Sequence, residues 1–398
     1  MPLRRAGRAA GLGRLPSLGH DFDRGHREYV SRLTPGGVIW LHTKPFSAPP
    51  SFELATCLRT FAHIIDELDL GLRAQVLDVG CGPGWLSEFL ARCGYWVTGI
   101  DISEDMVAIA RQRVGAIGEW VGEGVAPLAE FHALRVQDLP WENRFDAAVL
   151  YDTLHHFDDE RQTLRVLLRA LVPGGRLYVR EGVRPLPGSA DEQHLIAEMQ
   201  QYRTLESPFD PAYLRSVVEE VGFADVRQYV EVDELLGVRD FSRPLRLLGR
   251  LARIRLGLSR PDTNAIVATK PIPHGEEQHA FEACLTLAGP VAVAGDEIRV
   301  ALTAENSGRA YWPAGGGFPY PEGTVNFGPY LLRDGERQEL PRTQLPRSLG
   351  PGESATVVIV LPRAPLAGAS ELLIDMVREG IGWFSEPGAP PLRISPQA

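Results

Sequence analysis

A glycine-rich turn between a predicted strand and a predicted helix constrains the fold of this chain more than any other feature. The strand covers residues 75–79 and runs directly into Gly80, Gly82 and Gly84, after which helical spacing begins. Glycine suits a backbone that turns tightly at the carboxyl edge of a parallel sheet, where a side chain would collide with a bound ligand. A dinucleotide fingerprint needs its third glycine at position 85, but Trp85 stands there. The spacing therefore argues against a dinucleotide.

Residues 75 to about 232 alternate short β-rich runs with helical stretches, which is typical of a doubly wound parallel sheet in an α/β fold. A further strand follows a long insertion. The strands expected are Gln75–Val79, Tyr95–Ile100, Phe131–Val136, Phe145–Leu150, Arg176–Glu181, Val226–Val232 and Asn264–Thr269. The helices expected are Trp85–Cys93, Glu104–Arg113, Glu160–Leu171 and Pro211–Val221.

The chain changes character after a linker at 273–278, which is marked by Pro271, Pro273, His274 and Gly275. From residue 279 the helical period disappears, and alternating strands separated by Gly, Pro and Asn turns indicate an all-β sandwich. The strands expected there are Phe281–Leu287, Glu297–Glu305, Tyr330–Arg333, Ser354–Leu361, Glu371–Val377 and Leu392–Ile394.

Two acids follow predicted strands of the α/β region. Asp101 ends the second strand, where a carboxylate can accept hydrogen bonds from both hydroxyls of a ribose. By itself Asp101 could equally be the N-cap of the following helix. Asp138 and Leu139 follow the third strand, where an acid can meet an adenine amino group and an apolar side chain can cover the ring.

Four segments in this order resemble the successive motifs of class I S-adenosylmethionine-dependent methyltransferases: VLDVGCGPG, VTGIDIS, FDAAVLYDTLHHFDD and LVPGGRLYV. The resemblance spans roughly residues 60–270. It implies S-adenosylmethionine as cofactor, a Rossmann-like sheet of seven strands whose last strand is antiparallel, and a small-molecule, lipid or sugar acceptor. The cofactor contacts predicted on this basis are Asp78, Gly80, Cys81, Gly82, Gly84, Asp101, Ile102, Asp138, Leu139 and Tyr151.

His155 and His156 follow the fourth strand, at the topological switch region where reacting groups collect. Methyl transfer to an alcohol requires the hydroxyl proton to be removed, and histidine titrates near neutrality. We therefore expect one of the two, with a slight preference for His155, to be the general base. The alternative is that both only shape the pocket wall.

Two segments are expected to close the site around an acceptor. Residues 29–46 include Lys44, and residues 199–209 include Tyr202 and Glu206; these three side chains are the predicted acceptor-binding residues. Both segments carry aromatic and polar groups that suit a polyhydroxylated ligand. The first segment could instead be an ordinary packed N-terminal arm.

A basic amphipathic stretch at 239–260 interleaves seven arginines with leucine and isoleucine. Such a helix could rest on an anionic membrane or bind a phosphorylated, lipid-linked substrate. The alternative is a helical cover with a solvated basic face, which we favour because arginine is the usual cation of this chain.

Composition excludes several classes of function. The formal net charge of −10 argues against a nucleic-acid binder, since phosphate neutralisation needs a basic face. The four cysteines have no metal-ligand or disulfide-framework spacing, so we expect no metal and a reducing, cytoplasmic location. No secretory signal or membrane-spanning run is recognisable.

The sequence thus predicts a disordered tail at 1–18, a methyltransferase domain at 19–272, a linker at 273–278 and a second domain at 279–398. The methyltransferase domain would include an N-terminal cap at 19–60 and the basic insertion at 235–262. The second domain resembles the immunoglobulin-like modules of bacterial glycan-modifying proteins, in which exposed Trp312 and Trp383 would stack on sugars unless both are core residues. The function expected is O-methylation of a sugar or glycan intermediate. The alternatives are methylation of a quinone or other lipid at a membrane surface, and a non-catalytic glycan-binding or scaffold protein.

Overall fold

The computed structural model describes residues 21–46, 51–70, 74–121, 128–229, 248, 263–271, 281–314, 320, 323–333, 336–366, 371–385 and 390–394. The predicted tail at 1–18, the linker at 273–278 and all of the basic insertion at 239–260 except Leu248 lie outside these residues. Within these ranges, no helix combines the length and apolar character needed to cross a bilayer.

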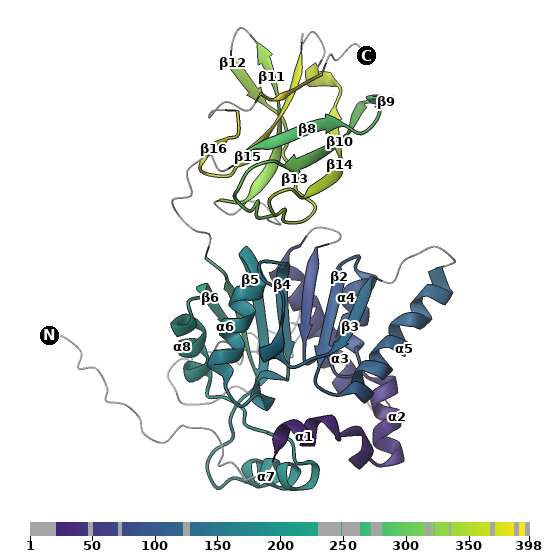
Figure 1. Cartoon of the computed structure of the whole chain (residues 1–398), viewed down its shortest axis with the longest axis vertical. Coiled ribbons are helices and arrows are strands. Elements are labelled where there is room, and N and C mark those ends of the chain that lie inside the picture. Colours follow the sequence, from purple (N-terminus) through teal and green to yellow (C-terminus); the bar gives the residue numbers. More distant parts are fainter. Residues whose placement is uncertain are drawn as a thin grey trace, which may run out of the picture.

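A seven-stranded sheet forms the centre of the α/β domain, in the order β3-β2-β1-β4-β5-β7-β6 (Figure 1). Strands β1 to β5 run parallel, whereas β7 runs antiparallel to both β5 and β6. The doubly wound sheet with an antiparallel last strand is therefore confirmed. The strands are β1 (Gln75–Val79), β2 (Trp96–Asp101), β3 (Ala129–Ala133), β4 (Phe145–Tyr151), β5 (Leu171–Gly182), β6 (Ala224–Tyr229) and β7 (Thr263–Thr269).

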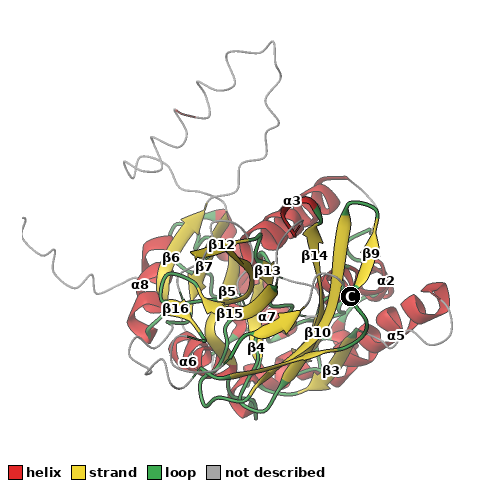
Figure 2. Ribbon diagram, turned by 90° about the horizontal axis from the view of Figure 1, so that it is seen from above, coloured by secondary structure: helices red, strands yellow, loops and turns green. Residues whose placement is uncertain are grey.

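Helices cover both faces of the sheet, because successive strand residues point to opposite sides (Figure 2). In β5, Leu177 and Val179 pack in the core beneath α6 and α8, whereas Tyr178 between them packs in the core of α3 and α4. The helices of this domain are α1 (Phe22–Arg27), α2 (Pro35–Thr43), α3 (Ser51–Leu68), α4 (Trp85–Arg92), α5 (Glu104–Val121), α6 (Glu160–Ala170), α7 (Ala190–Tyr202) and α8 (Pro211–Val221), with the 3-10 turns η1 (Val30–Arg32), η2 (Val136–Asp138) and η3 (Leu154–His156).

Local signals explain several helix ends. Asp159 and Asp210 cap α6 and α8, since each side chain accepts a hydrogen bond from a backbone N–H of the first turn. Gly222 ends α8 in the left-handed conformation at φ 112°. These caps account for the agreement between the predicted and observed bounds of both helices.

Several elements differ from the prediction: α5 extends to Val121, β5 begins at Leu171 and β6 covers Ala224–Tyr229. The differences at β3 and α7 have local causes. Strand β3 covers residues 129–133 rather than 131–136, because Ala129 pairs with Val97 and Ala133 with Asp101, after which the chain turns into η2. Helix α7 was not predicted: Ser189 caps its first turn, but its apolar residues follow no clear stripe, and only Met199 is buried.

The C-terminal region consists of two antiparallel sheets that share one apolar core. One sheet has the order β14-β10-β8 with β9 on β10, and the other has the order β12-β11-β15-β16 with β13 and β17 alongside. The predicted all-β architecture is confirmed, whereas the resemblance to immunoglobulin-like modules stays a prediction. The strands are β8 (Ala283–Leu287), β9 (Ala292–Ala294), β10 (Glu297–Asn306), β11 (Val325–Arg333), β12 (Glu336–Glu339), β13 (Thr343–Gln344), β14 (Ser354–Pro362), β15 (Leu372–Arg378), β16 (Gly382–Trp383) and β17 (Leu392–Ile394), with the 3-10 turn η5 (Ala364–Leu366).

Both tryptophans considered for sugar stacking are core residues. Trp312 is fully buried, with its ring 5.2 Å from that of Phe384. Trp383 is 8% exposed, and the guanidinium groups of Arg337 and Arg342 lie over its ring. The structure therefore supports the alternative in which these indoles stabilise the sandwich.

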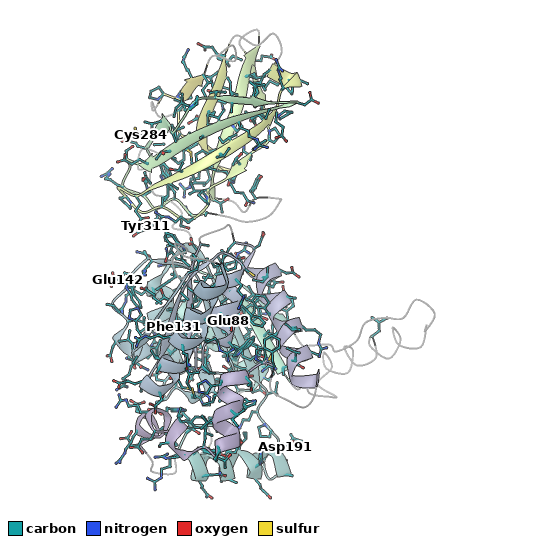
Figure 3. All side chains as sticks on the ribbon, turned by 90° about the vertical axis from the view of Figure 1, so that its right-hand side faces the viewer. Glu88, Phe131, Glu142, Asp191, Cys284 and Tyr311 are labelled. Carbon is teal, nitrogen blue, oxygen red and sulfur yellow. The ribbon has the colours of Figure 1, made fainter. Side chains whose placement is uncertain are left out.

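One buried carboxylate joins the two domains. Asp146, at the amino end of β4, accepts hydrogen bonds from the backbone N–H groups of Gln75 (2.8 Å) and Ser348 (3.1 Å). Burial raises the pKa of the Asp146 carboxyl, an effect that the Ser348 hydrogen bonds oppose. In Figure 3, Tyr311 lies at the end of the sandwich nearest the α/β domain, and Asp191 of α7 lies at the end of the α/β domain farthest from the sandwich. The sandwich is thus attached at the amino ends of the central strands β1 and β4, remote from α7.

We predict that Asp146→Ala lowers the free energy of unfolding by about 2–4 kcal/mol, because two backbone N–H groups lose their acceptor. Urea denaturation followed by tryptophan fluorescence measures this change. As a matched control, Asp296→Ala at an exposed turn should change stability by less than about 0.5 kcal/mol. Equal stability of the two variants would contradict a stabilising role for the Asp146 contacts.

Candidate functional site

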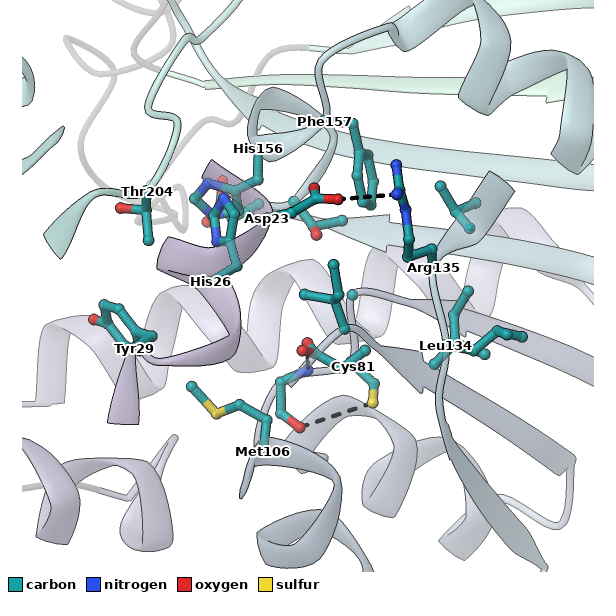
Figure 4. A pocket seen from close by; sticks show the side chains of 18 of the residues that line it. Asp23, His26, Tyr29, Cys81, Met106, Leu134, Arg135, His156, Phe157 and Thr204 are labelled. Atoms are coloured by element: carbon teal, nitrogen blue, oxygen red, sulfur yellow. Dashed lines mark hydrogen bonds and ion pairs between the residues drawn. The ribbon is translucent and has the colours of Figure 1, made fainter. Parts of the chain in front are cut away.

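A cavity of about 590 Å³ lies at the carboxyl ends of β1, β2 and β4. The glycine turn and the strand ends form one side, and residues of α1 and α2 line the other. In Figure 4, His26 of α1 lies beside His156, and the dashed line from Asp23 to Arg135 marks an ion pair of 3.1 Å. Side chains of the N-terminal segment thus line one side of the cavity.

The three glycines of the turn have different roles. All three have positive φ, but a Cβ at Gly80 would collide with Thr153 and one at Gly84 with Ala110. A Cβ at Gly82 would meet nothing within 4 Å, because this glycine faces the cavity. Gly80 and Gly84 therefore permit close packing, whereas Gly82 leaves space for a ligand.

Asp101 presents a carboxylate to the same space. Its two oxygens accept hydrogen bonds from the backbone N–H groups of Gly82 (3.0 Å) and Ser103 (2.9 Å). Burial raises the pKa of this carboxyl, while these hydrogen bonds oppose the rise. A carboxylate has about four acceptor positions, so acceptor capacity remains for a ribose hydroxyl. The cavity, the space at Gly82 and the Asp101 carboxylate together fit the adenosine part of S-adenosylmethionine.

Most of the predicted contact residues line this cavity. They are Gly80, Cys81, Gly82, Asp101, Ile102, Asp138, Tyr151, His156, Lys44 and Glu206. The remaining predicted residues, all of them described, lie behind the lining: Asp78, Gly84, Leu139, His155 and Tyr202.

Asp78 and Leu139, two of the residues behind the lining, make contacts within the protein. Asp78 is buried beneath the turn and accepts a hydrogen bond of 2.5 Å from the Ser87 hydroxyl of α4; burial raises its pKa to about 7. Leu139 packs in the core under α6, so the apolar lining on that side comes from Leu134 and Val136. Because β3 ends at Ala133, earlier than predicted, different residues after this strand face the cavity.

His155 lies between two carboxylates. Its Nδ1 donates a hydrogen bond of 2.5 Å to Glu181, and its Nε2 lies 3.2 Å from Glu206. Burial alone would lower the pKa of His155, but these two acids raise it well above its ordinary value. A protonated imidazole with both nitrogens engaged cannot accept a proton, so the geometry does not support the sequence-based preference for His155 over His156 as base.

His156 has the opposite arrangement. Its Nδ1 lies 2.6 Å from the carbonyl oxygen of Leu205, and because a carbonyl can only accept, Nδ1 carries the proton. In this tautomer Nε2 carries the lone pair that can accept a proton, and the side chain lines the cavity. Of the two histidines, only His156 has a nitrogen able to accept a proton from a ligand.

The N-terminal cap contributes aromatic and cationic groups. The Lys44 ammonium lies 4.8 Å from the centre of the Trp40 ring, and both side chains line the cavity. Tyr29 also lines it, and burial raises the pKa of this phenol to about 12. Tyr202, a predicted contact, instead packs its ring against Tyr29 at 5.4 Å.

Several site residues were missed in the sequence. Asp152 lines the cavity at φ 50°, and its carboxylate pairs with Arg180 of β5. His26 lines it from α1 and accepts a hydrogen bond from Leu205 N at 3.3 Å. Burial, with the nearby His156, lowers the pKa of His26 to about 3, so this imidazole is neutral. Asp152 lay within a quoted motif, but His26 carried no sequence signal.

His155, His156 and Glu206 each offer a ligand atom within 4.8 Å of the others. No metal was expected from the sequence, because the cysteines have no metal-ligand spacing. Both nitrogens of His155 and Nδ1 of His156 already have hydrogen-bond or ion-pair partners. These contacts describe a cluster of ionisable side chains that pair with one another.

Comparisons with known proteins agree with this geometry. Residues 77–179 match the family model described as "Methyltransferase domain". The chain is 36% identical over 119 residues to a ubiquinone biosynthesis O-methyltransferase of Xanthomonas oryzae, covering 29% of this chain and 46% of that protein. It is 32% identical over 166 residues to methyltransferase GfsG of Streptomyces halstedii, covering 41% and 57%. The chain thus spans about half the length of these curated relatives.

Among solved structures, phosphoethanolamine N-methyltransferase 2 of Haemonchus contortus in complex with S-adenosyl-L-methionine is 19% identical, with a TM-score of 0.45. The match covers 62% of this chain and 60% of that chain. The residues that match the methyltransferase domain model, 77–179, contain the glycine turn and Asp101, and S-adenosylmethionine is the cofactor of this region.

We predict that Gly82→Val abolishes S-adenosylmethionine binding while the protein stays folded, because the added side chain enters the open part of the cavity. Isothermal titration calorimetry measures the loss. Gly188→Val is the matched control: Gly188 also has positive φ and open space at its Cβ but does not line the cavity, so it carries similar backbone strain. Wild-type cofactor affinity in a folded Gly82→Val protein would exclude the turn from the binding site.

Proposed function

We propose that this chain transfers a methyl group from S-adenosylmethionine to a hydroxyl group of a small cyclic acceptor, with Nε2 of His156 as the general base. The observation that carries the proposal is the hydrogen bond from His156 Nδ1 to the Leu205 carbonyl oxygen. It fixes the tautomer and leaves a proton acceptor at a cavity that also contains the glycine turn and Asp101.

Different residues of the chain bind the cofactor, orient the acceptor and remove its proton. Asp101 and Gly82 hold the cofactor, which supplies a methyl group on a positively charged sulfur when bound. The cap around Trp40 and Tyr29 supplies an apolar wall that orients a ring and limits the entry of water. His156 removes the hydroxyl proton, since an alcohol is a poor nucleophile until it loses that proton.

A phenolic ring of the quinone-precursor type is the acceptor that we propose to test first. The aromatic side chains of the cap suit a flat ring, and several relatives are named ubiquinone biosynthesis O-methyltransferases. The proposal of a sugar or lipid-linked glycan acceptor is supported only by the sequence resemblance. The limits of the two domains, the location in the cytoplasm and a membrane contact through 239–260 are likewise still proposals.

We predict that His156→Gln lowers turnover by about 10²–10⁴-fold while S-adenosylmethionine affinity barely changes, because the ring faces the acceptor. The wild-type rate should also rise with pH, and the substitution should remove that limb. Methylated products from a panel of phenols and nucleotide sugars, followed by mass spectrometry, provide the measurement.

His194→Gln is the control, since His194 is an exposed histidine of α7 and should leave turnover unchanged. Nearly full turnover of His156→Gln with the pH limb intact would mean that the base is elsewhere. If His156→Gln raises only the KM for the acceptor and leaves kcat unchanged, His156 binds the acceptor and is not the base. No methyl transfer to any acceptor, despite cofactor binding, would favour a scaffold function.

A further inference from the structure

We propose that Glu206, predicted from the sequence to bind the acceptor, is the positioning carboxylate of His156, and that Glu181 and His155 hold Glu206 in this place. The inference rests on the proposed function, because it explains how the same site makes His156 a base. It assigns a role to three side chains whose contacts cofactor binding does not require.

The first step is the contact between Glu206 and His156. One carboxylate oxygen of Glu206 lies 3.6 Å from Nδ1 of His156. When Nε2 accepts a proton the ring becomes a cation, and an anion at this distance stabilises it. The hydrogen bond from Nδ1 to the Leu205 carbonyl holds the ring in the orientation that this interaction needs.

The second step is what keeps Glu206 ionised and in place. Its other oxygen lies 3.2 Å from Nε2 of His155, and the Thr204 hydroxyl donates a further hydrogen bond of 3.0 Å. Burial alone would raise the pKa of Glu206, but the neighbouring imidazoles and Thr204 lower it to about 2. Glu206 therefore stays anionic wherever His156 is able to act as a base.

The third step is the anchor for His155. Glu181, fully buried in β5, receives hydrogen bonds from Nδ1 of His155 (2.5 Å) and from the backbone N–H groups of Thr153 (3.1 Å) and Leu154 (2.7 Å). One carboxylate thus fixes both the η3 turn and the ring of His155. The chain of contacts runs from Glu181 through His155 to Glu206 and ends at His156.

Other ionisable groups also face His156 and set the background for its titration. His26 of α1 lies with its ring centre 4.9 Å away and is neutral, so it adds no charge. His155 of η3 is cationic and disfavours a second positive charge, and Asp101 of β2 interacts favourably at longer range. Glu206 is the nearest anion to His156 Nδ1 in the described structure, so its removal should have a distinct effect.

The test uses the isosteric variant Glu206→Gln in the full-length protein. The ring resonances of His156, assigned by their absence in His156→Gln, are followed by NMR against pH. Without the carboxylate, the midpoint of the titration should move to lower pH by about 1 unit, because the protonated ring loses its anion. Glu219→Gln, at an exposed glutamate of α8, should leave the midpoint unchanged.

Turnover gives a second measurement. Glu206→Gln should lower kcat by about 10- to 100-fold, less than the loss of the base itself, with little change in the acceptor KM. Glu181→Gln should move the His156 midpoint in the same direction, since it weakens the support of Glu206. Because the NMR midpoint needs no acceptor, it tests the inference even if no methyl transfer is found.

Three results would overturn the inference. The first is an unchanged His156 midpoint in a folded Glu206→Gln protein. The second is a loss confined to the acceptor KM, which would make Glu206 an acceptor ligand. The third is binding of Zn²⁺ or Mg²⁺ by the wild-type protein that Glu206→Gln abolishes, together with turnover that requires the cation, which would make the cluster a metal site.

Discussion

The carboxylate of Glu181 is the interaction on which the arrangement of the site depends. It lies fully buried at the end of β5 and accepts two backbone N–H groups of the η3 turn together with His155. A buried carboxylate is costly unless it is hydrogen-bonded and paired with a cation, and the turn supplies both. As a result, the chain after β4 presents His156 to the cavity and retains His155 behind it. The position of His156 at the cavity thus depends on the hydrogen bonds that one buried carboxylate accepts.

The fold was largely predictable because its signals are local. The glycine turn at 80–84, the caps at Asp159 and Asp210 and the apolar runs of the strands each act within a few residues. The lining of the cavity beside the glycine turn was predictable for the same reason. Asp101 is the last residue of its strand, and its position beside the glycine turn comes from the parallel register of β1 and β2.

The acceptor side could not be predicted in the same way. It depends on contacts between segments distant in sequence. The ring of His26 packs against the ring of His156, and the Glu206 carboxylate contacts both His155 and His156. Two adjacent histidines look equivalent in a sequence, yet pairing with Glu181 makes one a fixed cation and leaves the other a proton acceptor. Helix α7, with a single buried residue, has too weak a stripe to be predicted.

A complex with S-adenosylhomocysteine, the product of methyl donation, tests the central claim most directly. The account predicts that a crystal structure of this complex shows the ribose hydroxyls on the free acceptor positions of Asp101, the backbone of Gly82 against the ligand, and the sulfur on the same side of the cavity as Nε2 of His156. A ligand bound elsewhere, or bound with its sulfur facing away from His156, would contradict the account.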